Sequence, residues 1–267
     1  AGALGKTSVV HLKVDTGMGR VGCPYGEAAE IARAINRELR HTFLEGIYTH
    51  FPVAEEPERG DNREFTLRQI AEMKELKAAL EGEGIHVPLY HCANTGAVRS
   101  FPEAAFDMVR VGISAYGCHP SGEGKRLGLR NVLSFRTKVI FVKRVPAGTS
   151  ISYGRRYVTE RETTIATLPV GYADGYPLGL SNRGVVLING KRYRIAGRVC
   201  MDQCMVDVGD DGVQVGDEAE LFWERGEERF TVEEAADLLG TIPYEVMCRI
   251  APRVPRIHVG LEGIDMG

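Results

Sequence analysis

Apolar residues in the first 115 positions alternate between short continuous runs and longer amphipathic stretches. Four short runs predict strands: residues 9–14, 44–51, 87–91 and 108–111. Three stretches with apolar side chains at helical spacing predict helices: residues 27–39, 62–82 and 95–100. Because strands that alternate with helices usually form a parallel sheet, this part predicts an α/β fold of about four βα units.

The pattern changes after residue 126. Short apolar runs now lie between Gly- and Asp-rich turns and predict strands at residues 133–145, 163–170, 184–199 and 218–223. Thr231 followed by two glutamates predicts the start of a short helix. Residues 119–125 have the composition of a linker. We therefore predict two domains, an α/β domain at residues 1–126 and a mostly-β domain at residues 127–267.

Composition and charge exclude several classes of protein. The chain has 267 residues, of which 43% are hydrophobic and 26% charged, so disordered and coiled-coil proteins fit poorly. The formal charge of −3 argues against nucleic acid or a membrane surface as the main partner. No apolar run approaches the roughly 20 residues that span a bilayer. The six cysteines form no Cys-x-x-Cys pair, which favours free thiols and a cytoplasmic location.

The segment from Lys13 to Gly22 carries the most concentrated chemistry. A predicted strand places Lys13 and Asp15 on one face, and a glycine loop with Arg20 follows. The loop contains the letters of a dinucleotide-binding Gly-x-Gly-x-x-Gly motif. The next predicted strand, however, ends at His50-Phe51 and lacks the acidic residue that such a site needs, so dinucleotide binding is disfavoured.

Polar residues also end the other strands of the first part. His50 ends the second strand, His91 the third and Arg110 the fourth. Enzymes of the (β/α)8 class build their active sites at the C-terminal ends of parallel strands. Each histidine alone fits a structural role, but the three residues together with Lys13 and Arg20 favour a common site.

The residues after the third and fourth strands could hold an anion. Asn94 and Thr95 stand at the start of a predicted helix, where backbone amides can cradle a phosphate. Gly112 and Ile113 could present two further amides. A plain helix N-cap is the alternative interpretation of Asn94.

Tyrosines and polar residues mark several turns of the β part. Tyr153 lies in the segment ISYGR, Tyr172 in GYADGY and Met201 in CMDQ. Taken one by one, these segments are typical of turns.

Eight segments in order along the chain together resemble the alanine racemase family, enzymes of fold type III that use pyridoxal phosphate (PLP). They are LKVDTGMGRVG, THF, HCANTG, MVRVGISAYG, ISYG, GYADGYP, GRVCMDQCMVDVG and YEVMC…RVPR. The resemblance implies a PLP-binding (β/α)8 barrel followed by a β domain. It also implies a homodimer with shared active sites that interconverts L- and D-alanine and supplies D-alanine for cell-wall peptidoglycan.

The resemblance implies catalytic roles for four residues. Tyr153 resembles the tyrosine that enters the partner subunit's site and exchanges the Cα proton on one face of the substrate. His50, Arg110 and His91 resemble the hydrogen-bonded chain that supports this tyrosine. Arg110 resembles the arginine that hydrogen-bonds the pyridine nitrogen of PLP and leaves it unprotonated, because a guanidinium hardly ever gives up a proton.

The resemblance also implies binding roles. Four residues fall at or beside the phosphate cradle: Asn94, Thr95, Gly112 and Ile113. Arg20 and the backbone of Met201 resemble contacts to the substrate carboxylate, and Tyr172 resembles a residue of the entryway. Lys13 resembles a lysine that is often carbamylated, which would turn a cation into an anion able to hold Arg20.

One feature of the family is missing from the sequence. The PLP lysine of the family lies in an early segment of the type Lys-Ala-Asn-Ala-Tyr-Gly-His-Gly, which these 267 residues do not contain. A (β/α)8 barrel takes about 250 residues, far more than the predicted first domain. We therefore expect the C-terminal part of a racemase that lacks about four βα units. Two alternatives stay open: a non-catalytic fragment, dimerisation module or half of a split enzyme, and a serine or broad-specificity racemase.

Overall fold

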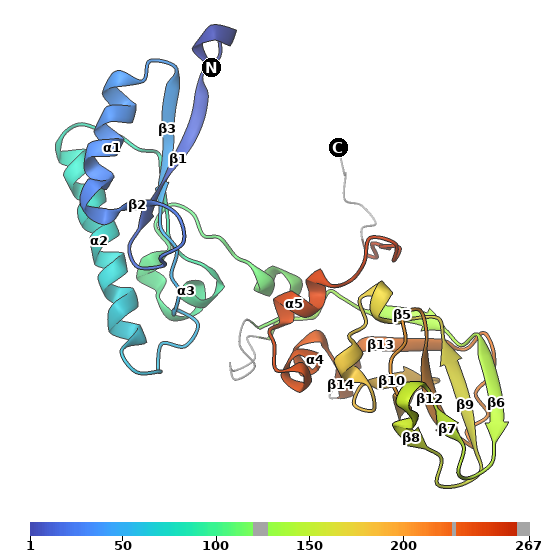
Figure 1. Cartoon of the computed structure of the whole chain (residues 1–267). Coiled ribbons are helices and arrows are strands. Elements are labelled where there is room, and N and C mark those ends of the chain that lie inside the picture. Colours follow the sequence, from blue (N-terminus) through green and yellow to red (C-terminus); the bar gives the residue numbers. More distant parts are fainter. Residues whose placement is uncertain (120–127, 226–227, 261–267) are drawn as a thin grey trace. The chain divides into compact units, whose positions relative to one another are not determined.

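Two compact units make up the chain, Ala1–Ala115 and Tyr116–Gly267. A computed structural model describes residues 1–119, 128–225 and 228–260 of it (Figure 1). The domain boundary predicted between residues 126 and 127, and all of the predicted linker except His119, lie outside the described residues. In the described ranges, no helix has the length and apolar character needed to cross a membrane.

The first unit is built on a parallel sheet, as the alternation of strands and helices predicted. Its strands are β1 (Ser8–Asp15), β2 (Cys23–Pro24), β3 (Thr42–Tyr48) and β4 (Leu89–His91). They lie in the order β2-β1-β3-β4, and each pair is parallel. The predicted strands at residues 9–14, 44–51 and 87–91 are therefore confirmed to within a few residues.

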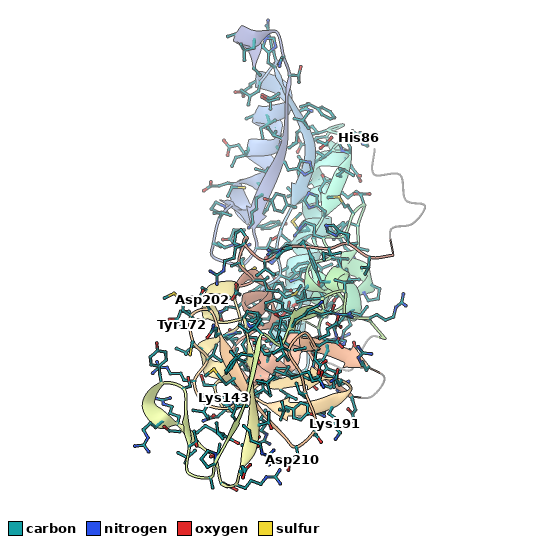
Figure 2. The ribbon with its side chains drawn as sticks, turned by 90° about the vertical axis from the view of Figure 1, so that its right-hand side faces the viewer. His86, Lys143, Tyr172, Lys191, Asp202 and Asp210 are labelled. Atoms are coloured by element: carbon teal, nitrogen blue, oxygen red, sulfur yellow. The ribbon has the colours of Figure 1, made fainter. Side chains whose placement is uncertain are left out.

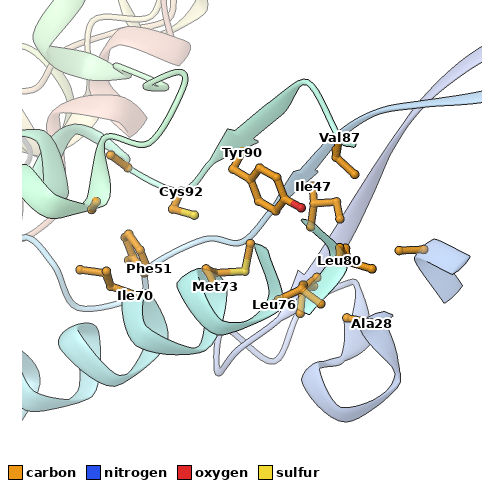
Figure 3. Close-up of a cluster of buried hydrophobic side chains, with 14 of the residues drawn as sticks. Ala28, Ile47, Phe51, Ile70, Met73, Leu76, Leu80, Val87, Tyr90 and Cys92 are labelled. Carbon is orange, nitrogen blue, oxygen red and sulfur yellow. The ribbon is translucent and has the colours of Figure 1, made fainter. Parts of the chain in front are cut away.

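Helices cover one face of this sheet and bury the core of the unit. They are α1 (Tyr25–Glu38), α2 (Asn62–Gly82) and α3 (Thr95–Ser100), with short 3-10 turns at Gly2–Leu4, Pro102–Ala104 and Ile113–Tyr116. The stripe Ile70, Met73, Leu76 and Leu80 of α2 packs beneath Tyr90 of β4 (Figure 3). Burial of such side chains stabilises the fold by about 1.5–3 kcal/mol each, so this contact holds β4 in place.

The predicted strand at residues 108–111 does not form. Asp107 and Arg110 each donate one backbone hydrogen bond, to the carbonyl oxygens of Tyr90 and Ala93, so the segment follows the end of β4 without a continuous ladder. Val109 and Val111 remain 41% and 45% exposed. The apolar run was misread as a buried strand because its side chains are only partly covered within this unit.

The second unit is mostly β. Its strands are β5 (Phe135–Lys138), β6 (Phe141–Val145), β7 (Ser150–Ile151), β8 (Tyr157–Val158), β9 (Thr163–Leu168), β10 (Val185–Ile188), β11 (Lys191–Arg194), β12 (Cys204–Gly209), β13 (Glu218–Arg225) and β14 (Glu228–Phe230). They form a five-stranded sheet in the order β11-β10-β13-β14 with β5 beside β13, a three-stranded sheet β12-β9-β6 and the hairpin β7-β8. The fold class, an α/β part followed by a mostly-β part, is confirmed.

Two helices follow the strands, α4 (Val232–Leu239) and α5 (Pro243–Cys248), and 3-10 turns lie at Tyr153–Arg155, Tyr172–Asp174 and Leu178–Leu180. The predicted helix start is confirmed. The Thr231 hydroxyl accepts a hydrogen bond from the Glu234 amide, and the Glu234 carboxylate accepts one from the Thr231 amide. This capping box satisfies two backbone donors that would otherwise be unpaired. Within this unit the apolar pattern did not predict α5, β7, β8, β12 or β14.

Candidate active site

A pocket of about 540 Å³ lies at the C-terminal ends of the parallel strands of the first unit. The strand register explains its position, because Lys13 of β1 is paired with Tyr48 of β3, and Tyr48 with His91 of β4. These three side chains therefore lie in one row across the sheet. The pocket is lined by His11, Lys13, Arg20, Val21, Tyr48, His50, His91 and Arg110.

Arg110 is the centre of the hydrogen bonds around this pocket. Its Nη1 donates to the Nδ1 atom of His91 (2.6 Å) and to the His91 carbonyl (2.6 Å). Its Nη2 donates to the Thr49 carbonyl (2.7 Å), with longer contacts to Cys92 O (3.3 Å) and His50 Nδ1 (3.4 Å). Within the described part of the chain, the Nε–H of Arg110 has no hydrogen-bond partner. This group is therefore available to an acceptor on a bound ligand.

Both histidines beside Arg110 are held in the neutral form. His91 is buried, and it stacks on the Tyr48 ring with 4.7 Å between ring centroids. Burial, with help from the Arg110 and His11 charges, lowers the pKa of His91 to about 4. Burial and the charges of Arg110, Arg20 and Lys13 also lower the pKa of His50. At neutral pH the positive charge of the site therefore lies on its lysine and arginines.

Lys13 and Arg20 add to the positive charge of the pocket. The Lys13 ammonium donates to the Val21 carbonyl (2.6 Å). Burial lowers the pKa of Lys13, and nearby Arg20 and Arg110 act in the same direction, although Asp15 opposes them. Among the residues that the structure describes, three cations and no carboxylate line this pocket. Such a surface suits an anionic ligand.

The glycine loop after β1 folds around a carboxylate of this chain. The amides of Gly17 and Gly19 donate to Asp15 Oδ1 at 3.0 and 3.1 Å, and these bonds lower the pKa of Asp15. A Cβ atom at Gly22 would lie 2.9 Å from the Lys13 carbonyl oxygen. The glycines therefore allow the chain to turn back closely toward β1. The Gly17 and Gly19 amides, which would be needed to bind a dinucleotide phosphate, are already bonded to Asp15.

The segment after β4 shows how the four expected cradle residues are arranged. Asn94 is the N-cap of α3, since its Oδ1 accepts from the Ala97 amide (3.0 Å). The Thr95 hydroxyl accepts from the Gly112 amide (2.9 Å) and keeps its own proton to donate. Ile113, which begins a 3-10 turn, is buried. All four residues lie within one small region of the first unit.

The three expected site residues of the second unit are exposed on turns. Tyr153, Tyr172 and Met201 are 71%, 45% and 54% exposed. Tyr172 and Ala173 donate backbone hydrogen bonds to the carbonyls of Cys200 and Met201, so two of these turns lie together. Tyr172 and Asp202 are seen near each other in Figure 2.

The backbone of these turns is held firmly although their side chains are exposed. A Cβ atom at Gly171 would lie 2.5 Å from the carbonyl carbon of Met201. Arg253 joins the turns by pairing with Asp174 (2.7 Å) and Asp202 (2.8 Å). Ser152, just before Tyr153, has a positive φ of 65° and donates to the Arg198 carbonyl (2.6 Å).

Sequence reasoning missed three residues of the pocket, His11, Val21 and Tyr48. The signal for His11 was present, because it lies two residues before Lys13 on the same strand and therefore on the same face. Tyr48 was hidden inside an apolar run. One pocket brings together five of the residues expected in this unit's site: Lys13, Arg20, His50, His91 and Arg110. The four expected cradle residues, Asn94, Thr95, Gly112 and Ile113, are not among the described residues that line it.

A parallel α/β unit with a cationic pocket at its strand ends, followed in the same chain by a mostly-β unit with exposed tyrosines on its turns, defines an α/β-plus-β class of protein. Family models agree with this class. Residues 1–120 match the model "Alanine racemase, N-terminal domain", and residues 132–258 match "Alanine racemase, C-terminal domain". The chain belongs to the alanine racemase family, whose members are isomerases that act on amino acids.

Individual relatives are similar over nearly the whole chain. The alanine racemase of Carboxydothermus hydrogenoformans is 48% identical over 259 residues, which are 96% of this chain and 69% of the relative. Alanine racemase 2 of Caldanaerobacter subterraneus is 45% identical and covers 96% of this chain and 65% of its own length. The chain thus spans about two thirds of the curated relatives that it matches.

Solved structures show the same similarity. The alanine racemase of Streptomyces lavendulae matches with a TM-score of 0.88 and 40% identity, over 97% of this chain and 68% of that one. The alanine racemase of Bacillus anthracis, solved with bound L-Ala-P, matches with a TM-score of 0.83 and 36% identity. It covers 94% of this chain and 64% of that one.

Proposed function

We propose that this protein interconverts L- and D-alanine with PLP as its cofactor. The observation that carries the proposal is the Arg110-centred pocket, in a chain that belongs to the alanine racemase family. We place the reaction in the cytoplasm, and its product D-alanine would serve cell-wall peptidoglycan. We also keep the domain division at residues 1–126 and 127–267.

The residues of the pocket fit the proposed cofactor. Of the described residues that line the pocket, three are cations and none is a carboxylate, which suits an anionic cofactor and an anionic substrate carboxylate. The Nε–H of Arg110 suits an aromatic nitrogen that accepts a hydrogen bond. Thr95 can donate its hydroxyl proton, and Asn94, Gly112 and Ile113 complete the proposed phosphate region. When bound, PLP supplies a conjugated ring that withdraws electrons and so acidifies the Cα–H bond of an amino acid.

Arg110 would determine the protonation state of a nitrogen atom that accepts a hydrogen bond from it. A guanidinium donates hydrogen bonds but hardly ever gives up a proton, so a ring nitrogen that accepts from it stays unprotonated. His91 is an example within the pocket: its Nδ1 accepts from Arg110, and burial, followed by the Arg110 charge, lowers its pKa to about 4. A ligand nitrogen that accepts from the Arg110 Nε–H would likewise stay unprotonated. This favours reversible proton exchange over a long-lived carbanion.

We assign substrate binding to residues of both units. Arg20, next to Lys13 in the first unit, would hold the alanine carboxylate. A carbamate on Lys13 would hold Arg20 in turn, since the modification replaces a positive charge by a negative one. The backbone of Met201, contributed by a partner subunit, would contact the carboxylate, and Tyr172 would line the entryway.

Proton transfer at Cα needs one base on each face. Tyr153 is the proposed base on one face, and its 71% exposure fits a side chain that acts in the site of a partner subunit in a homodimer. His50, Arg110 and His91 would support it. The base on the other face is the PLP lysine, which the resemblance places in a segment not found in these 267 residues.

The missing lysine segment also favours a second candidate, a non-catalytic module or half of a split enzyme. Intact mass and borohydride reduction of the purified protein, as the cell makes it, separate the two. The racemase proposal predicts turnover of alanine and a pyridoxyl group on a lysine outside these 267 residues. A single 29.3 kDa species with a pyridoxyl group and turnover would refute the claim that the lysine is missing. Absence of both adduct and turnover would favour the second candidate.

A further inference from the structure

A line of hydrogen bonds leaves the pocket on the far side of His91. His91 Nε2 lies 2.8 Å from His11 Nδ1, and His11 Nε2 lies 2.8 Å from Glu45 Oε2. His91 is buried, the side chain of His11 is 28% exposed and that of Glu45 is 40% exposed. The line therefore runs from Arg110 at the pocket to a carboxylate near the surface.

Elementary donor and acceptor chemistry gives this line one direction. Arg110 can only donate, so His91 Nδ1 must accept and the ring proton of His91 must be on Nε2. His91 then donates to His11 Nδ1, which leaves the proton of His11 on Nε2, facing Glu45. An ionised carboxylate can only accept, so it matches this end of the line. Both rings are thus restricted to a single tautomer.

Two features of β3 bring Glu45 and His11 together. The register changes from Val10 paired with Leu44 to His11 paired with Gly46, so Glu45 is an extra residue in a β-bulge. A bulge redirects a side chain, here toward His11. A Cβ atom at Gly46 would lie 2.6 Å from Cε1 of His11, so the ring can lie across the strand only where this position has no side chain.

We propose that Glu45 and His11 are positioning residues, which hold His91 as the Nε2–H tautomer and thereby hold Arg110 in the pocket. The inference deepens the proposed function, because Arg110 is the residue assigned to the cofactor ring. Glu45 and His11 do not line a proton path to the pocket centre. Along this line of hydrogen bonds, a proton could reach a ligand on Arg110 only through the guanidinium, which does not release it.

The test is the tautomer of each histidine, read from the ring 15N signals of the full chain. Wild type should show Nε2–H for both His91 and His11. Glu45→Leu removes the acceptor, so His11 should become a mixture of tautomers and the Arg110 Nη1–H, which donates to His91, should exchange faster with solvent. Glu45→Gln keeps an acceptor oxygen and should retain the wild-type tautomers. Glu83→Gln, which breaks the surface pair with Arg33, is the matched control.

Gly46→Ala tests the same inference without touching a polar group. It should displace the His11 ring and reproduce the signals of Glu45→Leu, whereas Gly26→Ala, with open space around it, should change nothing. In a racemase assay, Glu45→Leu should lower kcat about three- to tenfold with little change in KM, as the loss of one hydrogen bond implies.

Three results would overturn the inference: a wild-type His11 with its proton on Nδ1, an unchanged His11 tautomer in Glu45→Leu, or a changed tautomer with unchanged Arg110 exchange. Glu45 lies near the surface, so its variants should fold even if Gly46→Ala does not. If the wild type does not turn over alanine, the proposed function fails, while the 15N signals and Arg110 exchange still decide this inference.

Discussion

The two units hold their site residues in different ways. In the first unit Arg110, His91 and Lys13 bond to one another or to nearby carbonyl groups, and burial lowers the pKa of His91 and of Lys13. In the second unit the backbone is held and the side chains are free, as with Tyr153 and Tyr172.

The two units therefore differ in how far their own contacts fix the orientation of the site side chains. The first unit sets the direction and charge of its polar groups by its own contacts. The second unit presents Tyr153 and Tyr172 as exposed side chains on turns. Substitutions in the first should therefore change both stability and activity, whereas substitutions of the exposed tyrosines should change activity alone. The predictions below test this separation.

Replacement of Tyr153 by Phe should have the largest effect on activity. We expect racemisation to fall about 1,000-fold from either enantiomer, because L- and D-alanine have equal free energies and the two directions must slow together. Exchange of the Cα proton without inversion should be lost for one enantiomer only, since a general base on one face is removed. The unfolding free energy should change by less than about 0.5 kcal/mol because the side chain is 71% exposed. Kinetics in both directions and chemical denaturation give the two numbers.

Tyr193→Phe is the matched control, because Tyr193 lies in the same unit and donates to Asp211 at the surface. It should leave turnover unchanged. Equal rates for wild type and Tyr153→Phe in both directions would contradict the role of Tyr153.

Arg110→Lys should lower kcat/KM about 100-fold and also reduce stability. An ammonium cannot reproduce the fork that bonds His91 and the Thr49 carbonyl together, so the positive charge would no longer be aimed into the pocket. Steady-state kinetics and thermal unfolding are the measurements. A variant with normal kinetics would show that Arg110 is only structural.

Gly171→Ala should destabilise the second unit by about 2 kcal/mol, because a methyl group would press on the backbone of Met201. Limited proteolysis and thermal unfolding would detect this loss. The hydrogen-bond geometry of His91 in the first unit should not change, and altered ring 15N signals of His91 would break the separation of the two regions.

The pH dependence of stability should show the smallest effect. His91 has a folded pKa of about 4, below its usual value of 6.5, so the unfolded chain takes up a proton first as the pH falls. The contribution of neutral His91 to the free energy of unfolding is complete above pH 6.5 and is lost between pH 6.5 and about 4. Between pH 8 and 5.5 the loss should be about 1 kcal/mol. In urea unfolding, the His91→Gln variant should not show this loss of unfolding free energy. An equal loss in both proteins would contradict its assignment to His91.

Periodicity predicted the helices and three strands of the first unit well, because each element has one continuous apolar face. It failed at residues 108–111, where an apolar run stays exposed. It also did not predict β12 (Cys204–Gly209), which begins directly after the turn at Met201.

The site was predictable where residues end a strand, as with His50 and His91. It was not predictable where the strand register alone brings a residue to the site. Glu45 meets His11 only because of a bulge in β3, and neither periodicity nor spacing indicates a bulge.

Alanine turnover in D2O tests the central claim most directly. The protein, as the cell makes it and supplied with PLP, is incubated separately with L-alanine and D-alanine, and both enantiomers and their Cα deuterium are measured. The account predicts conversion in both directions, with deuterium at Cα of the product, and slower conversion of serine. No conversion of alanine from either side, or faster conversion of serine, would contradict it.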